Sequence, residues 1–122
     1  PHSAQVAIEQ WKRVRGDEAQ LVTGHCVAHI SGLDVVGRSA ESASTVVRFA
    51  DVDDDEIEAY VSTGEPLEVA GAFTLDGRGG WFIAGIEGDP SSVIGIGLPT
   101  VRHLLRRLDI PVTALWSPTS TA

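Results

Sequence analysis

Three stretches of the sequence combine residue types that could bind an ion or a phosphate. His25, Cys26 and His29 carry the nitrogen and sulfur donors that zinc prefers. Residues 51–56 hold five carboxylates that could chelate a divalent cation. Residues 76–80, Asp-Gly-Arg-Gly-Gly, could arrange backbone N–H groups around a phosphate, with one arginine as the counter-charge. Each stretch also has a structural explanation, which depends on the element that carries it.

The histidines and the cysteine fall in a segment that alternates with period two. This pattern predicts a strand, on which His25 and His29 point to one face and Cys26 points to the other. A structural zinc site also takes four ligands. Ordinary packing and surface roles are therefore the alternative to metal binding. The face that carries the cysteine is small and apolar, formed by Val22, Gly24, Cys26, Ala28 and Ile30.

The acidic run of residues 51–55 leads into a predicted short helix. An EF-hand would need a glycine at the sixth position and a glutamate at the twelfth, and both are absent. Asp53 and Glu56 instead have the spacing of a capping box. The helix would bury an apolar stripe and end at Gly64. The stripe consists of Ile57, Tyr60 and Val61. A solvated, capped helix start explains the acidic run without a ligand.

The glycine-rich region of residues 70–80 has two interpretations that the spacing leaves open. Asp76-Gly77 is a strong turn signal, and the following residues 81–86 predict a buried strand, so a flexible hairpin turn competes with a phosphate nest. Gly95 and Gly97 precede a predicted helix and give a weaker anion-site signal. The third glycine of the dinucleotide fingerprint is missing there, as is the Lys-Ser/Thr pair of a P-loop.

The remaining elements must position these residues. A helix is predicted between Ser3 and Gly16, followed by a hairpin whose second strand centres on residues 44–49, with Gly37 marking a bulge. A last helix is predicted to begin at Leu98-Pro99, with an apolar stripe formed by Val101, Leu104, Leu105 and Leu108. A final strand is expected over residues 112–116. Because helices and strands are interspersed, the predicted class is α/β, or α+β, with a mixed sheet and flanking helices.

Composition excludes several function classes. The 122 residues fit one domain, and a net charge of −8 argues against a broad nucleic-acid-binding face. No apolar run approaches the ~20 residues that span a bilayer. The single cysteine, Cys26, cannot form an internal disulfide, which fits a reducing cytoplasm. The sequence begins with Pro1 and contains no methionine, so we expect a removed segment or a piece of a longer reading frame.

One ordered set of motifs is specific. Residues 60–73 contain G-E-P-x-x-x-A-G, and residues 88–95 read G-D-P-S-x-V-I-G. Together with residues 75–83 and Leu98-Pro99, they closely resemble the Maf (septum-formation inhibitor-like) nucleoside triphosphate pyrophosphatases, and the detail is most similar to actinobacterial members. Upstream segments around residues 22–25 and 41–49 match the family's hairpin, so the resemblance covers nearly the whole chain, from about Pro1 to Trp116.

The resemblance implies a two-lobed ITPase/Maf-like α/β fold with a nucleotide cleft between the lobes. It also implies hydrolysis of a nucleoside triphosphate to the monophosphate and diphosphate with magnesium or manganese. Removal of modified or non-standard nucleotides and arrest of cell division are the implied roles. The family's S-x-S-x-x-R segment and catalytic aspartate have no counterpart here. Residues 1–116 are therefore expected to be the C-terminal portion of a single domain, without catalytic or metal-binding residues, and residues 117–122 a frayed tail.

The resemblance places three substrate-binding residues within this chain: Gly71, Asp76 and Gly77. Members that prefer dTTP and UTP carry a glutamine before a glycine at the position of Asp76. Glutamine can donate and accept toward a pyrimidine edge, whereas an ionised aspartate only accepts, so the substitution argues against a pyrimidine preference. Val69 replaces a lysine that is frequent in other members, which removes a cation.

Two alternatives to an enzyme remain at this level. The first is a non-catalytic remnant that binds nucleotide weakly or only self-associates, for example as a homodimer. The second is an unrelated small-ligand module of similar pattern. Without further strands the sheet would expose a long unpaired edge, so the isolated chain is expected to self-associate and to be inactive. The expected partner is a nucleoside triphosphate, with neither nucleic acid nor membrane.

Overall fold

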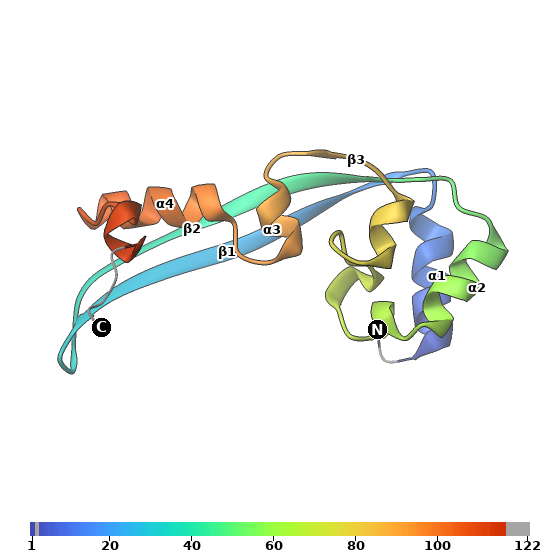
Figure 1. The fold of residues 1–122 in the computed structure, drawn as a ribbon, viewed down its shortest axis with the longest axis horizontal. Coiled ribbons are helices and arrows are strands. Elements are labelled where there is room, and N and C mark those ends of the chain that lie inside the picture. The colour runs from blue at the N-terminus through green and yellow to red at the C-terminus, as the bar shows by residue number, and fades with distance from the viewer. Residues whose placement is uncertain (2, 117–122) are drawn as a thin grey trace.

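The computed structural model describes residues 1 and 3–116, and the predicted tail of residues 117–122 lies outside them. The molecule is elongated (Figure 1): helices α1 and α2 gather at one end, and a long two-stranded ribbon runs from them toward α4 at the other. Short 3-10 helices fill the connections. In chain order the helices and strands are α1 (Ala4–Val14), β1 (Glu18–Ser31), β2 (Asp34–Phe49), α2 (Asp54–Ser62), β3 (Ile83–Glu87), α3 (Pro90–Ile94) and α4 (Leu98–Arg107).

The sheet has three strands in the order β1-β2-β3, and both pairings are antiparallel. The predicted hairpin is confirmed as β1 and β2. The prediction of a mixed sheet is wrong for the described residues, because these strands follow one another without a parallel crossover. His29 pairs with Gly37 and Ile30 with Val35, which leaves Val36 as the extra residue of a bulge. The bulge thus lies directly beside the glycine that predicts it.

The two faces of the ribbon differ in burial. Helices α3 and α4 run along one face (Figure 1), where Leu104 and Leu105 of α4 are buried. The predicted helix that begins at Leu98-Pro99 is therefore confirmed, with these two leucines at the centre of its stripe. The small apolar face of β1 is turned outward, and Val22 and Ile30 there are 61% and 60% exposed.

Trp11 is the centre of the core at the helical end. Ser3 caps α1 by accepting a hydrogen bond from the backbone N–H of Val6, as predicted, and this helix carries Trp11 inward. The indole is 1% exposed. Its ring meets three aromatic rings edge-to-face, at centroid distances of 5.4, 5.7 and 5.9 Å. These rings belong to Phe49, Tyr60 and Phe82, so the tryptophan joins α1, β2, α2 and the segment before β3.

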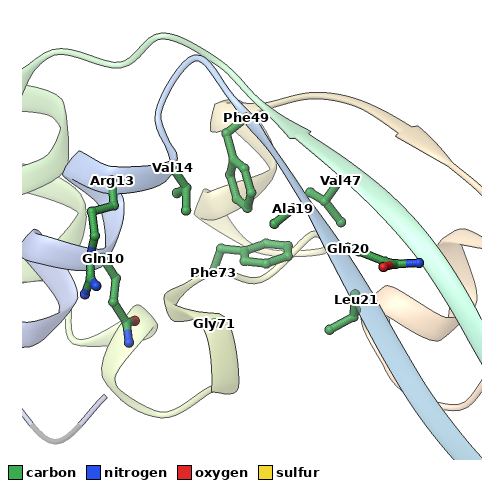
Figure 2. A pocket seen from close by; sticks show the side chains of 10 residues that line it. All are labelled: Gln10, Arg13, Val14, Ala19, Gln20, Leu21, Val47, Phe49, Gly71 and Phe73. Carbon is green, nitrogen blue, oxygen red and sulfur yellow. The ribbon is translucent and has the colours of Figure 1, made fainter.

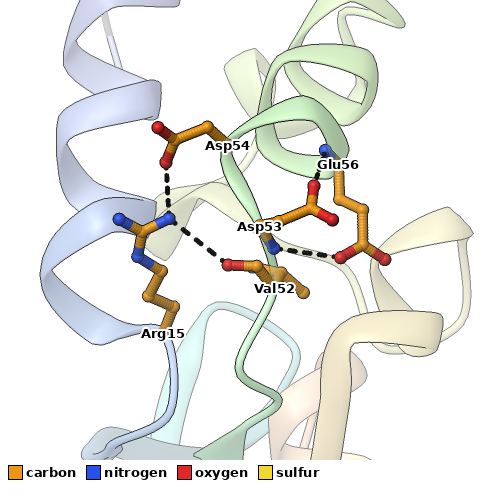
Figure 3. A network of polar contacts seen from close by, with 5 residues as sticks. All are labelled: Arg15, Val52, Asp53, Asp54 and Glu56. Carbon is orange, nitrogen blue, oxygen red and sulfur yellow. Dashed lines mark hydrogen bonds and ion pairs between the residues drawn. The ribbon is translucent and has the colours of Figure 1, made fainter.

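The acidic run holds α2 in place (Figure 3). Asp53 and Glu56 form the predicted capping box, with backbone-to-carboxylate distances of 2.8 and 3.0 Å. Arg15, just after α1, donates to Asp54 at 2.6 Å and to the carbonyl of Val52 at 3.3 Å. The hydrogen bond from Arg15 lowers the pKa of the Asp54 carboxyl. The structure therefore accounts for three of the five acidic side chains as caps and partners between helices.

Two predicted strands are wrong in part or in full. Residues Arg78–Phe82 form a 3-10 helix, so the strand expected over residues 81–86 begins only at Ile83. Three glycines here, Gly77, Gly79 and Gly80, permit close packing, because a methyl group on any of them would lie within 2.5 Å of a neighbouring atom. The Gly80 N–H bonds to the Gly77 carbonyl at 3.1 Å. Val112–Trp116 is also a 3-10 helix. The Ala114 N–H bonds to the carbonyl of Pro111, which makes a local turn instead of a sheet ladder.

No helix among the described residues is long and apolar enough to cross a bilayer.

Candidate functional site

Two of the three predicted substrate-binding residues line one cavity of about 340 Å³. Gly71 and Asp76 stand on one wall, in the irregular segment between α2 and β3. The alternating side chains of β1 supply Leu21 and Thr23, and α3 supplies Val93. The walls are largely apolar, and the exposed Asp76 carboxylate stands among them as an acceptor.

A second cavity, of about 420 Å³, adjoins the first, because Leu21, Gly71 and Phe73 line both. Figure 2 shows Phe73 and Phe49 at its apolar side, with Gln10 and Arg13 of α1 across from them. The Oε1 atom of Gln10 is buried without a hydrogen-bond partner among the described residues. The lining residues of the two cavities come from α1, from the ribbon, from the segment between α2 and β3, and from α3 and the residue after it.

The turn at Gly71 shapes the wall between the two cavities. Gly71 has φ +77° and Ala72 has φ +63°, so two successive residues take the left-handed conformation. Alanine adopts this conformation at a cost of about 1 kcal/mol, which the surroundings must offset. Trp11 does so by donating its indole N–H to the Ala72 carbonyl at 2.6 Å. The core at the helical end therefore fixes the backbone that lines the cavities.

Glu65 is hydrogen-bonded to the loop that carries Asp76. It belongs to a 3-10 helix, Glu65–Leu67, that follows α2. Its Oε1 atom accepts hydrogen bonds from the Thr74 hydroxyl and from the Arg78 backbone N–H, the latter at 3.0 Å. A methyl group on Gly77 would lie 1.7 Å from the same oxygen. Gly77 therefore packs against Glu65 and does not line the cavity, in contrast to the other two predicted residues.

Tyr60 supports the same loop from α2. Its hydroxyl oxygen accepts from the Thr74 backbone N–H at 3.3 Å, and burial raises the pKa of the phenol above its usual value. The phenol therefore stays neutral near pH 7. A methyl group on Gly79 would lie 2.5 Å from this hydroxyl and 2.7 Å from the Thr74 carbonyl oxygen. The glycines of residues 76–80 thus allow a close fold around Glu65 and Tyr60.

The zinc hypothesis concerns His25, Cys26 and His29, which the structure does not bring together as metal ligands. His25 Nε2 accepts from the Gly97 backbone N–H at 3.0 Å, which ties β1 to the start of α4. Cys26 points to the exposed face. Asp89 caps α3 at its Ser91 N–H, and the Ser91 hydroxyl lowers the pKa of the Asp89 carboxyl. Across residues 1 and 3–116, no three His, Cys, Asp or Glu side chains gather as metal ligands do.

The amino-acid sequence matches the model of a known protein family. The model of a family described as "Maf-like protein" matches residues 1–108, which is most of the chain. This chain belongs to the Maf family. The similarity that the motifs of residues 60–73 and 88–95 predict is therefore confirmed.

Curated Maf relatives from actinobacteria share about half of their aligned residues with this chain. The proteins from Nocardia farcinica and Mycolicibacterium smegmatis are each 53% identical, over 116 and 117 residues, and that from Saccharopolyspora erythraea is 48% identical over 118. Each is named "Nucleoside triphosphate pyrophosphatase". The alignments cover 95%, 96% and 97% of this chain but 55%, 56% and 56% of the relatives. The chain thus spans about half the length of the curated relatives it matches.

Reasoning from the sequence did not assign Glu65 or Tyr60 to this candidate site. The pattern signals Tyr60 only as a core residue of α2, and its hydroxyl contact depends on a loop fourteen residues further along the chain. The sequence does carry a signal for Glu65, because this residue stands between a glycine and a proline. In the structure Gly64 has φ +82° and Pro66 is fully buried, so the backbone is fixed on both sides of the Glu65 carboxylate.

Proposed function

We propose that the complete protein that contains this chain hydrolyses nucleoside triphosphates to the monophosphate and diphosphate. The carrying observation is membership of the Maf family, with relatives of about 50% identity that bear the name of this activity. The adjoining cavities near Gly71 are consistent with a binding role. Action on modified or non-standard nucleotides, a role in cell-division arrest and a cytoplasmic location are part of the proposal.

In this proposal the cavity beside Asp76 receives the nucleobase. Leu21, Val69 and Val93 offer apolar surface against which a flat base can pack. An ionised aspartate only accepts hydrogen bonds, so Asp76 favours a base edge that presents N–H donors. The exocyclic amino groups of cytosine and adenine are such donors, whereas thymine and uracil present a carbonyl at the corresponding position.

Divalent-metal dependence belongs to the proposal for the complete protein. Bound magnesium or manganese would neutralise charge on the triphosphate and lower the pKa of an attacking water. Among the described residues, no three His, Cys, Asp or Glu side chains are grouped as metal ligands. In this proposal we assign to the chain the binding and orientation of the base.

The activity is tested on the complete product of the reading frame that encodes this chain. We expect metal-dependent diphosphate release from at least one common or modified nucleoside triphosphate, measured by a coupled phosphate assay. The isolated 122-residue chain is expected to be inactive in the same assay. Absence of release by the complete product with every triphosphate would overturn the proposed function.

The alternative of a self-associating, non-catalytic protein has one observation in its favour. β1 pairs only with β2 within the described residues, so fourteen residues of its other edge carry no strand partner. If the complete protein releases no diphosphate and this alternative holds, light scattering is expected to show a homodimer or a larger species. A monodisperse, inactive monomer would exclude this alternative as well.

Replacement of Asp76 by glutamine is expected to shift selectivity toward dTTP or UTP. The amide supplies the donor that a pyrimidine carbonyl needs, and a net hydrogen bond corresponds to roughly a 2- to 10-fold change in relative kcat/KM. The measurement compares kcat/KM for four common triphosphates in wild type and D76Q. Asp55→Asn, at an exposed carboxylate on α2, serves as the charge-matched control. Identical selectivity in D76Q and wild type would remove this role from Asp76.

A further inference from the structure

The loop of residues 74–78 is held at both ends by one carboxylate oxygen. Thr74 donates its hydroxyl to Glu65 Oε1, and Arg78 donates its backbone N–H to the same atom. Asp76 lies midway between these donors, two residues from each. A single acceptor therefore draws the ends of a five-residue loop together and leaves the residue at its apex exposed beside the cavity.

The closeness of this contact depends on Gly77. A methyl group there would lie 1.7 Å from Glu65 Oε1 and 2.5 Å from the Thr74 hydroxyl oxygen. Any side chain would therefore displace the carboxylate from the loop. The glycine after Asp76 is thus required by Glu65, and the two residues form one unit with Thr74 and Arg78.

Glu65 itself is held on rigid backbone. Gly64 at φ +82° ends α2, and Pro66 is fully buried, so the residue between them has little freedom to move. The Leu67 N–H bonds to the Gly64 carbonyl at 3.1 Å and closes the short helix. Tyr60, on the preceding helix, accepts the Thr74 N–H and thereby holds one end of the loop a second time.

The second oxygen of Glu65 is an exception to normal pairing. Oε2 is buried and has no hydrogen-bond partner among the described residues. Native structures pair nearly all buried polar atoms, and departures from that rule concentrate at functional sites. All hydrogen bonds of the Glu65 carboxylate among the described residues are therefore made by Oε1, and both of them bind the loop.

We propose that Glu65 is a positioning residue that sets the place of Asp76 at the base end of the nucleotide cavity. This inference rests on the proposed function, because it assigns to Glu65 the control of selectivity in that reaction. In the proposed function the loop contacts the base and not the reacting phosphates. Loss of the Glu65 contacts is therefore expected to raise KM for the preferred triphosphate and to change kcat less.

The test compares Glu65→Ala with Glu68→Ala in the complete protein. Glu68 is an exposed glutamate three residues further along, so the control removes the same charge from the same segment. We expect E65A to reduce the ratio of kcat/KM between the best and worst common triphosphate about tenfold, mainly through KM, and E68A to leave it unchanged. Glu65→Gln keeps the accepting oxygen and is expected to retain most of the selectivity.

Amide hydrogen exchange supplies a readout that is independent of activity. In E65A the amides of residues 74–80 are expected to exchange at least about tenfold faster, while those of α1 stay protected. An active wild type with unchanged selectivity in E65A would overturn the positioning role and leave the proposed function intact. A wild type without diphosphate release would overturn the proposed function. Whatever the activity, unchanged amide exchange of residues 74–80 in E65A would show that Glu65 does not hold the loop.

Discussion

Replacement of Trp11 by alanine is expected to lower the free energy of unfolding by about 3–5 kcal/mol. The indole is 1% exposed and touches three aromatic rings from three different segments of the chain. Its removal leaves a cavity that these rings cannot fill without giving up their edge-to-face contacts. It also leaves the Ala72 carbonyl, which the indole N–H binds at 2.6 Å, without its donor.

Urea unfolding of the complete protein, followed by circular dichroism, measures this effect. Trp81 is 85% exposed, so Trp81→Ala is the matched control, with an expected change within about 0.5 kcal/mol. Trp11→Phe keeps most of the ring and loses the hydrogen bond, so it is expected to fall between the two variants. Equal effects of W11A and W81A would show that the core at the helical end does not depend on Trp11.

Replacement of Gly79 by alanine is expected to destabilise the protein by about 3 kcal/mol. The added methyl group would lie 2.5 Å from the Tyr60 hydroxyl, 2.7 Å from the Thr74 carbonyl oxygen and 2.9 Å from the Thr74 nitrogen. Two of these obstacles are backbone atoms, which cannot rotate away as a side chain does. The loop must therefore separate from Tyr60, and the Thr74 N–H loses its acceptor.

The control for this substitution is Gly24→Ala on the exposed face of β1. A methyl group there meets no other atom within 4 Å, and the backbone lies outside the left-handed region, so the expected change is within about 0.5 kcal/mol. Thermal unfolding of both variants gives the comparison. A G79A protein as stable as G24A would mean that the loop of residues 74–80 does not pack on Tyr60.

The elements that could be predicted from the sequence are those with local causes. The serine cap of α1, the Asp53–Glu56 capping box and the left-handed stop at Gly64 each depend on residues within one helical turn. The period-two pattern of β1 and β2 likewise indicates a hairpin directly. These signals require no knowledge of distant contacts.

The errors arise where distant contacts or glycines decide the backbone. The apolar residues Trp81 and Phe82 favour a strand, yet the preceding glycines fold around Glu65 and Tyr60, which belong to a different segment. For residues Val112–Trp116 the pattern indicates a strand, but a strand forms only where a neighbour offers a ladder. The same limit applies to the candidate site: motif resemblance selects Asp76 and Gly71, which line one cavity, whereas the role proposed for Glu65 rests on three-dimensional contacts.

The long ribbon has an entropic consequence for the core at the helical end. Trp11 and Ala72, which bond to each other, are 61 residues apart in sequence, so direct closure from the unfolded chain would restrict a long loop. Pairing of Glu18 with Arg48 at the base of the ribbon brings α1 beside the segment that leads to α2. Once β1 and β2 are paired, the residues within the ribbon no longer belong to the flexible loop that must be closed. Each halving of that loop lowers the entropic cost of closure by about 0.6 kcal/mol. Pairing that starts at the turn containing Gly32, which has φ +64°, therefore shortens the flexible loop between Trp11 and Ala72.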